Sequence, residues 1–260
     1  MGVGEIPAEL LRSLGQRGNN RLFKLASKIY ETGEVPSDFK QSTIVTIPKL
    51  THADKYEDYR TISLVSHASK LITKIVCRRI ENKIDNELDE DQFGFRKSRG
   101  TREAILTLRL LIEGRLKKNK DTYMASVDLE KSFDNVNWNK MFEILRTIGL
   151  RFRDRGIIYN LYKDQVAIIR VEDQERQASI KKGVRQGCSL SPLLFNMYVE
   201  EAMKKLKEEF AGGVKIQGEE IKMLRFADDI ILLAEREEEL GNILNGMDRL
   251  LREEFELKIN

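Results

Sequence analysis

Proline and cysteine are both scarce in this sequence, with 4 Pro and 2 Cys in 260 residues. Cys77 and Cys188 lie far apart and form no CxxC pair, which excludes a disulfide framework and argues against a zinc site, and indicates a reducing compartment. No apolar run approaches the roughly 18 residues that a membrane span needs. The N-terminus also lacks the layout of a signal peptide. We therefore expect an intracellular protein, in the nucleus or the cytoplasm, that is neither secreted nor held in a membrane.

Charge is plentiful but unevenly distributed. The chain is 41% hydrophobic and 33% charged, which is typical of a helix-rich globular protein. Residues 1–120 carry 23 Lys and Arg against 16 Asp and Glu, whereas residues 121–260 carry 22 against 26. The basic N-terminal half fits contact with a polyanionic partner, and the acidic C-terminal half fits contact with that partner through bound metal ions. A solvated helix face is the alternative interpretation of the basic run at 96–120.

The periodicity of apolar residues predicts both helices and strands. Helices are expected at residues 20–32, 66–86, 102–118, 137–148, 153–163, 191–210 and 236–254. Strands are expected at residues 42–48, 123–129, 165–171, 176–181, 221–226 and 230–234. The order in the second half predicts an α+β fold with an antiparallel sheet backed by helices.

Three aspartates fall at the ends of these strands. Asp128 follows what we expect to be a buried strand, and Asp228 and Asp229 lie on a tight turn between two apolar strands. Converging carboxylates repel one another unless a cation offsets them. Mg²⁺ prefers such hard oxygens, and two ions roughly 3.5–4 Å apart stabilise both oxygens of a phosphoryl displacement. An Asp-Asp turn alone would be a polar hairpin tip, but with Asp128 the metal interpretation is the better one.

A glycine-bracketed basic loop at residues 183–187 precedes a helix that begins with Ser191 and Pro192. Its backbone amides and the helix dipole could hold a phosphate or a sugar edge. By spacing alone it could equally be an ordinary strand-to-helix turn.

The chain resembles the reverse transcriptases of non-LTR retrotransposons, with the nearest likeness to RTE-type elements. Six motifs carry the resemblance in order: VPSDFKQSTIVTIPK, YRTISLVSHASKLITKIVCRRI, DQFGFRKSRGTREAI, VDLEKSFD, GVRQGCSLSPLLFN and LRFADDIILLAE. Several ordered motifs are far more specific than any one of them. The resemblance implies a right-hand polymerase fold with fingers and palm, and an RNA-directed DNA polymerase activity.

The resemblance also implies roles at the catalytic centre. It makes Asp128 and Asp228 the main ligands of two Mg²⁺ ions, with Mn²⁺ as an alternative. Asp229 would be the neighbouring carboxylate, and the carbonyl of Leu129 a backbone ligand. Phe133 would lie under the nucleotide sugar and exclude a 2′-hydroxyl, although most phenylalanines in such positions are plain core.

Further implied contacts concern the nucleotide and the nucleic acid. Lys49 and Arg60 match residues at the triphosphate, although Lys49 could be only a solvated strand end. Gln186 and Gly187 match a loop at the templating base pair. The basic residues expected to bind the template backbone are Arg96, Lys97, Arg99 and Arg102.

The expected organisation is an N-terminal extension and fingers at residues 1–122, followed by the palm at 123–260. Within the palm, residues 137–185 partly return to the fingers side. The resemblance implies that the sequence stops before the thumb, which would leave a sheet edge unpaired and make nucleic-acid binding weak and salt-sensitive.

The expected partners are an RNA or DNA template with its primer and a deoxynucleoside triphosphate; the sequence does not predict an oligomeric state. One alternative is a nucleic-acid-binding transposon remnant that is inactive or poorly active. An RNA polymerase is disfavoured by Phe133. A two-metal nuclease would need more carboxylates or histidines.

Overall fold

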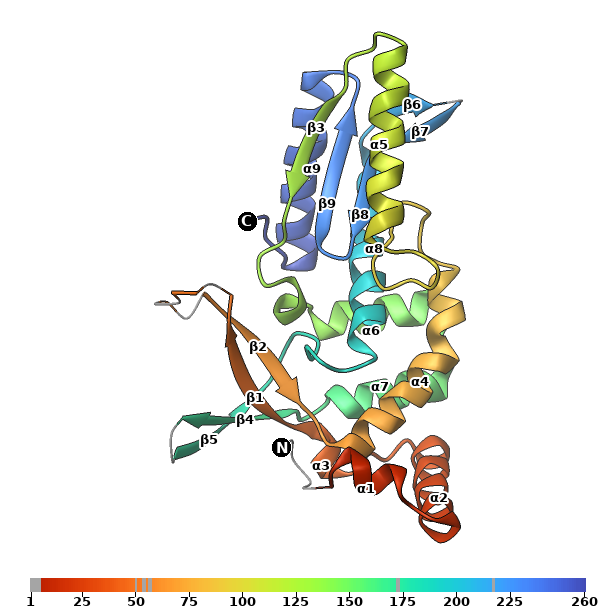
Figure 1. Ribbon diagram of the computed structural model, residues 1–260, viewed down its shortest axis with the longest axis vertical. Coiled ribbons are helices and arrows are strands. Elements are labelled where there is room, and N and C mark those ends of the chain that lie inside the picture. Colours follow the sequence, from red (N-terminus) through yellow and green to blue (C-terminus); the bar gives the residue numbers. More distant parts are fainter. Residues whose placement is uncertain (1–5, 50, 53–54, 56–57, 172–173, 217) are drawn as a thin grey trace. The chain divides into compact units, whose positions relative to one another are not determined.

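The computed structural model describes residues 6–49, 51–52, 55, 58–171, 174–216 and 218–260 (Figure 1). The chain forms two compact units. The first comprises Met1–Asn82 and Leu145–Ser191, and the second comprises Lys83–Ile144 and Pro192–Asn260. The chain passes from one to the other within helices α4 and α6 and at the start of α8. The boundary expected at residues 122 and 123 falls inside the second unit.

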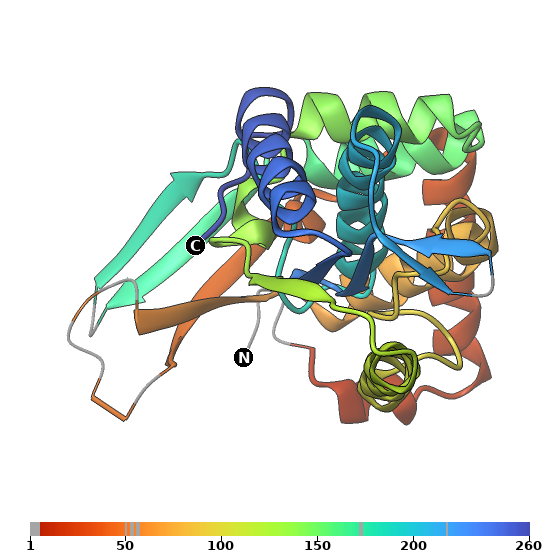
Figure 2. The same cartoon turned by 90° about the horizontal axis from the view of Figure 1, so that it is seen from above.

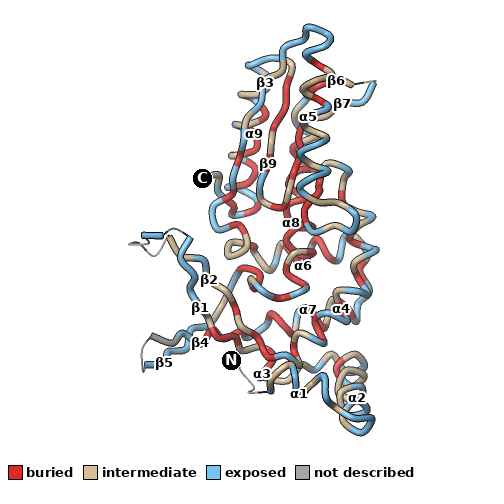
Figure 3. The backbone as a smooth tube through the Cα atoms, viewed as in Figure 1, coloured by how far each residue is buried: buried red, intermediate tan, exposed pale blue. Residues whose placement is uncertain are grey.

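The first unit combines helices with a four-stranded sheet. Its helices are α1 (Ala8–Arg12), α2 (Gln16–Thr32), α3 (Ser37–Lys40), most of α4 (His67–Asp85) and α7 (Phe152–Tyr162). Its strands are β1 (Gln41–Pro48), β2 (Tyr59–Leu64), β4 (Val166–Val171) and β5 (Gln174–Ser179), in the order β2-β1-β4-β5. Strands β1 and β4 run parallel, and the other neighbours are antiparallel. Strand β5 is exposed along its length, as the pale tube in Figure 3 shows.

The second unit is built on an antiparallel sheet of three strands in the order β3-β9-β8. These strands are β3 (Tyr123–Val127), β8 (Met223–Phe226) and β9 (Asp229–Ala234). A separate hairpin pairs β6 (Val214–Ile216) with β7 (Glu219–Ile221). The helices are α5 (Thr101–Lys117), α6 (Trp138–Thr147), α8 (Ser191–Glu209) and α9 (Glu237–Phe255), with a short 3-10 helix at Ser132–Asn135. The predicted α+β class and the antiparallel sheet backed by helices are both confirmed.

Helices cover both faces of the three-stranded sheet. Helix α9 packs against β9 and β3, and helix α5 packs against β8. Figure 2 shows the sheet edge-on, with α8 and α9 on one side and α5 on the other. A buried cluster lies between α5 and the sheet and includes Phe93, Leu111, Val214, Leu224 and Leu233. The sheet is therefore fixed from both faces, and the turn at its end is carried on a rigid layer.

Most predicted elements occur within a few residues of their expected limits. Gly33 and Gly149 end their helices with left-handed backbone, at φ 74° and 72°. Asn137 caps α6 through a bond from the Lys140 N–H to its side-chain oxygen, at 3.2 Å. The predicted strand at 221–226 is wrong in one respect. It is divided at Lys222 into β7 and β8, which pair with different strands. The Lys222 ammonium group donates to the Lys207 and Phe210 carbonyls near the end of α8, at 2.8 and 2.6 Å.

One expectation about β3 is corrected. The strand was expected to be buried, but of its residues only Val127 is; helix α9 packs against β3, whereas α5 packs against β8. An unpaired sheet edge was also expected, and β3 is an outer strand of the described sheet. The residues directly after it are paired, because the Glu130 N–H donates to the Lys258 carbonyl and the Asn260 N–H donates to the Asp128 carbonyl, both at 2.9 Å. Residues 258–260 thus run antiparallel to residues 128–130 and pair with them.

A buried ionic network anchors β8. The Arg225 side chain is fully buried and donates from Nη2 to Glu200 Oε2 at 2.8 Å and from Nε to Asp91 Oδ1 at 2.9 Å. Burial by itself would lower the pKa of Arg225, but the charges of Asp91 and Glu200 outweigh it and raise the pKa. The guanidinium therefore stays charged and ties α8, β8 and the segment at 91–93 together.

Removing one partner of this network is expected to destabilise the second unit strongly. Glu200→Ala leaves the buried Arg225 with only Asp91, and we expect a loss of about 3–5 kcal/mol in the free energy of unfolding. Urea denaturation followed by circular dichroism measures it. The matched control is Glu113→Ala, which breaks the exposed Arg109–Glu113 pair and should leave the midpoint almost unchanged. Equal midpoint shifts in the two variants would contradict this account of the network.

Candidate active site

The Ala227–Asp228 turn joins β8 to β9 at one end of the sheet. Phe226 pairs with Asp229, so the turn has only two central residues, and Asp229 is the first residue of β9 rather than part of the turn as expected. Ala227 has φ 59° and is 4% exposed. A positive φ at the first central residue is typical of the type II′ hairpin turn. For a residue other than glycine it costs about 1–2 kcal/mol, so the surroundings must hold the turn in place.

Asp128 lies beside this turn because of the strand register. Val127 pairs with Ile230, so continuing the antiparallel register by one residue sets Asp128 opposite Asp229. Opposite residues in an antiparallel pair have Cβ atoms roughly 4.5–5.5 Å apart. The structure therefore brings the first aspartate of the motif at 127–134 against the two aspartates of the hairpin.

Burial and the two neighbouring carboxylates act together on Asp229. Burial, then the charge of Asp228, then that of Asp128, raise the pKa of Asp229 above its ordinary value of 3.8. Each added negative charge disfavours ionisation of its neighbour. A cation placed among these groups would remove the repulsion, so the chemistry of the donor set fits a hard divalent ion.

Two of the carboxylates accept hydrogen bonds from the protein. The Ser132 hydroxyl donates to Asp228 Oδ2 at 3.1 Å, and the Asn260 side-chain amide donates to Asp128 Oδ2 at 3.1 Å. Within the described part of the chain, no group of three His, Cys, Asp or Glu side chains is arranged to hold a metal ion.

Leu129 pairs with Ile259, and its side chain is buried. Of the two hydrogen bonds that flank this pair, one is donated by the Glu130 N–H and the other is accepted by the Asp128 carbonyl. Neither uses the carbonyl of Leu129, which the resemblance makes a metal ligand.

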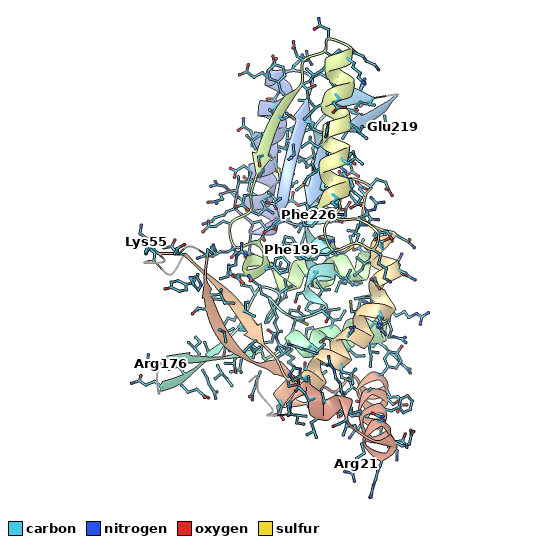
Figure 4. The ribbon with its side chains drawn as sticks, in the orientation of Figure 1. Arg21, Lys55, Arg176, Phe195, Glu219 and Phe226 are labelled. Carbon is cyan, nitrogen blue, oxygen red and sulfur yellow. The ribbon has the colours of Figure 1, made fainter. Side chains whose placement is uncertain are left out.

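Phe133 lies in an aromatic stack next to the aspartates. It is half-buried on the 3-10 helix, and its ring stacks on Phe195 with centroids 4.4 Å apart and planes 21° apart. Phe95 meets the same ring edge-on at 6.2 Å. Phe195 is fully buried on α8, and Figure 4 shows it and Phe226 near the same end of the unit. A buried ring thus supports Phe133 from behind.

The sequence motifs contained Ser132 and Phe195 but gave no sign of their roles. Ser132 is four residues after Asp128, and its hydroxyl reaches Asp228, 96 residues later in the chain. Phe195 belongs to the motif at 183–196, where it reads as an ordinary core residue. Only the tertiary fold shows that both contact the expected site.

Apart from Phe133, which belongs to the second unit, the expected nucleotide-binding residues lie in the first unit. The register of β1 and β2 pairs Ile47 with Arg60, and the Lys49 N–H donates to the Asp58 carbonyl at 2.7 Å. Lys49 and Arg60 are therefore diagonal neighbours on one face of the ribbon, and both are exposed.

The loop with Gln186 and Gly187 packs against β2 of the same unit. The Ser63 N–H donates to the Gln186 carbonyl at 2.9 Å. Gly187 has φ 102°, and a Cβ there would lie 3.3 Å from the Ser63 carbonyl oxygen. The buried Arg185 guanidinium donates to the Phe39 and Lys40 carbonyls at 2.9 and 2.7 Å. In the first unit, the β1–β2 pair of strands thus contacts this loop and also positions Lys49 and Arg60.

The four expected nucleic-acid-binding residues differ in exposure. The Arg96 side chain is 6% exposed and donates to the Asp85 carboxylate at 2.7 Å and the Asp89 carbonyl at 2.6 Å. Arg99 pairs with Glu90 and lies 5.9 Å from the Phe93 ring. Lys97 and Arg102 are exposed. Lys97 and Arg102 are therefore better placed than the other two to contact a phosphate backbone. Arg96 instead holds together the segment around Asp85 and Asp89.

Comparison with known proteins agrees with the motifs and the fold. The family model described as "Reverse transcriptase (RNA-dependent DNA polymerase)" matches residues 47–260. The Pol polyprotein of a type-1 retrotransposable element R2 from Popillia japonica is 30% identical over 79% of this chain and 29% of its own length. Its counterpart from Nasonia vitripennis is 31% identical over 88% of this chain and 22% of its own length. The chain thus spans less than a third of these relatives.

A solved structure supports the fold. Apo telomerase from Candida tropicalis, truncated from its C-terminal domain, has a TM-score of 0.67 and 15% sequence identity. The match covers 94% of this chain and 54% of that one. In the described residues no helix is both long and apolar enough to cross a membrane. Because the family model matches most of this chain, the chain belongs to the reverse transcriptase family.

Proposed function

We propose that this chain is the fingers and palm of an RNA-directed DNA polymerase of a non-LTR retrotransposon. It would add a deoxynucleotide to a primer 3′-hydroxyl on a template strand. The observation that carries the proposal is the strand register, which sets Asp128 opposite Asp229 and beside the Ala227–Asp228 turn at one end of the sheet. In a member of this family, such a cluster supports a metal-dependent phosphoryl transfer.

In this proposal the second unit is the palm. Asp128 and Asp228 would hold the metal ions, with Asp229 beside them and the Leu129 carbonyl as a further ligand. Two Mg²⁺ ions, or Mn²⁺ in their place, would neutralise charge on the attacking and leaving oxygens when bound. Ser132 would orient Asp228 through its hydrogen bond. The 3′-oxygen attacks the α-phosphorus, and pyrophosphate leaves, so the protein contributes position rather than a covalent intermediate.

Phe133 would select the sugar. The Phe133 ring stacks on the buried Phe195 ring. Because the protein interior is closely packed, Phe133 could not move far away from a nucleotide that carries a 2′-hydroxyl. Selection would then be steric, and it would need no hydrogen bond to the sugar.

The first unit would be the fingers. Lys49 and Arg60 would contact the triphosphate, and the Gln186–Gly187 loop would contact the base pair being formed. The template backbone would bind the basic segment that contains Lys97 and Arg102, with affinity that falls as salt rises. Substrates of this kind fit action inside the cell, and so do two cysteines that form no disulfide.

The metal role predicts a sharp loss of activity from one isosteric change. We expect Asp128→Asn to lower the rate of primer extension on poly(rA)/oligo(dT) with Mg²⁺ by about a hundredfold or more. The circular dichroism spectrum should be unchanged. Asp121→Asn, at the other end of β3, is the matched control and should extend primers like the parent. Binding of primer–template without extension by the parent itself would instead favour the inactive nucleic-acid-binding remnant.

Sugar selection is tested by shortening the stacked ring. We expect Phe133→Ala to raise incorporation of ribonucleotides relative to deoxynucleotides at least about tenfold, while DNA synthesis continues. Paired single-nucleotide additions with dTTP and UTP measure the ratio. Phe152→Ala removes an exposed ring from the first unit and should leave the ratio alone. Unchanged selectivity in Phe133→Ala would make Phe133 a core residue only.

The raised pKa of Asp229 predicts a stability change with a definite sign. The metal-free folded chain binds this proton more tightly than the unfolded chain, so stability is lost as the pH rises above about 3.8. Asp229→Asn should therefore have a slightly higher Tm than the parent at neutral pH in EDTA, and the two should converge in acid. The shift is small because Asp229 is exposed. Thermal melts across the pH range measure it, and a neutral-pH variant less stable than the parent would contradict the repulsion.

A further inference from the structure

A buried glutamine contacts the backbone of the aspartate turn. Gln92 is 0% exposed, and its Oε1 accepts two hydrogen bonds. One comes from the Ala227 N–H at 3.0 Å, and the other comes from the Gly94 N–H at 2.8 Å. The Ala227 N–H is the donor immediately before Asp228 in the strained turn. A single side-chain oxygen thus joins the segment at 91–95 to the turn that carries two of the three aspartates.

The backbone of Gln92 is itself fixed against β8. The Arg225 N–H donates to the Asp91 carbonyl and the Phe93 N–H donates to the Arg225 carbonyl, each at 2.8 Å. Gln92 and Arg225 form the resulting parallel bridge. The buried Arg225 side chain holds the same segment through Asp91. Gln92 therefore has little freedom to move away from the turn.

Close packing leaves the turn no other position. A Cβ on Gly94 would lie 2.3 Å from the Ala227 nitrogen, so the two backbones are in direct contact there. Asn196 on α8 donates to the Gly94 carbonyl at 2.8 Å. Both polar groups of the Gly94 backbone are thus bonded to fully buried side chains, the N–H to Gln92 and the carbonyl to Asn196.

We infer that Gln92 is a positioning residue for the metal-binding carboxylates of Asp228 and Asp229. It satisfies the buried Ala227 N–H and holds the positive φ of Ala227, and these together set where the next two carboxylates lie. Without that acceptor, the N–H would be buried and unpaired, and the turn would shift toward a more ordinary conformation. The inference rests on the proposed function for its meaning, because it supposes that these carboxylates bind metal. Residues that orient metal ligands typically change metal affinity about 10–100-fold when they are altered.

The test uses two variants that separate the acceptor from the bulk of the side chain. Gln92→Met keeps the length but has no strong acceptor, whereas Gln92→Glu keeps an oxygen for both N–H groups. The first readout is hydrogen exchange of the Ala227 amide by NMR, without metal. The second is the dissociation constant for Mn²⁺ as the only added ion, measured by electron paramagnetic resonance. Leu111→Ala, in the core between α5 and the sheet, is the control for lost stability.

Four outcomes are expected. Gln92→Met should speed exchange at Ala227 and weaken Mn²⁺ binding at least about tenfold. Gln92→Glu should restore slow exchange and bind Mn²⁺ at least as tightly as the parent. Leu111→Ala should lower the Tm and leave Mn²⁺ affinity unchanged. Asp228→Asn should weaken Mn²⁺ binding and leave Ala227 exchange slow.

The results that would overturn the inference differ from those that would overturn the function. Slow Ala227 exchange or parental Mn²⁺ affinity in Gln92→Met rules out the positioning role, and so does an equal affinity loss in Leu111→Ala. Failure of Gln92→Glu to restore affinity rules it out as well. Unchanged Mn²⁺ binding in Asp228→Asn instead contradicts the proposed metal site, while Ala227 exchange still shows whether Gln92 holds the turn.

Discussion

The convergence of three carboxylates at one end of the β3-β9-β8 sheet is the constraint on which the second unit depends. Asp128 and Asp229 are set opposite each other by the register of β3 and β9, and Asp228 occupies the two-residue turn beside them. Like charges this close together raise the free energy of the folded chain. The fold must therefore hold them with stabilising contacts, some to the carboxylates themselves and others to the backbone of the turn.

The contacts that hold the turn are made by the buried side chains of Arg225 and Gln92. The buried Arg225 connects β8 to Asp91 and Glu200, and Gln92 accepts from the Ala227 N–H. Helices α5 and α9 fix the sheet from its two faces. Rigid elements of this kind suit a site that must place charged ligands accurately. A small displacement of a ligand strongly lowers the affinity of such a site for a metal ion. The same arrangement extends to Phe133, which leans on the buried Phe195.

Local patterns in the sequence carried most of the fold. Glycines with positive φ at 33 and 149 and the Asn137 cap set helix limits that could be predicted, because each depends on one residue and its neighbours. The parallel pairing of β1 with β4 could not be predicted, since it joins residues more than 120 positions apart with no local signal. The burial of β3 was mispredicted because an apolar run does not tell an inner strand from an outer one.

The site was predicted less completely than the fold. Asp128 directly follows β3 and Asp228 lies in the turn, as expected, whereas Asp229 begins β9. Phe133 adjoins Ser132, whose hydroxyl donates to Asp228. The supporting residues were invisible at the level of sequence. Gln92 is a buried amide whose partner is a backbone N–H 135 residues away, and Ser132 and Arg225 likewise act through distant contacts. A polar residue within a motif suggests a role, but only the folded structure shows which groups its side chain contacts.

The most direct test of the account is template-dependent addition of a single nucleotide. Four RNA templates that differ only in the templating base would be annealed to one DNA primer and offered each deoxynucleoside triphosphate with Mg²⁺. The account predicts addition of the complementary nucleotide on each template, and its complete arrest when a chelator removes the metal. Addition that ignores the templating base, or bound primer–template that is never extended with Mg²⁺ or Mn²⁺, would contradict it.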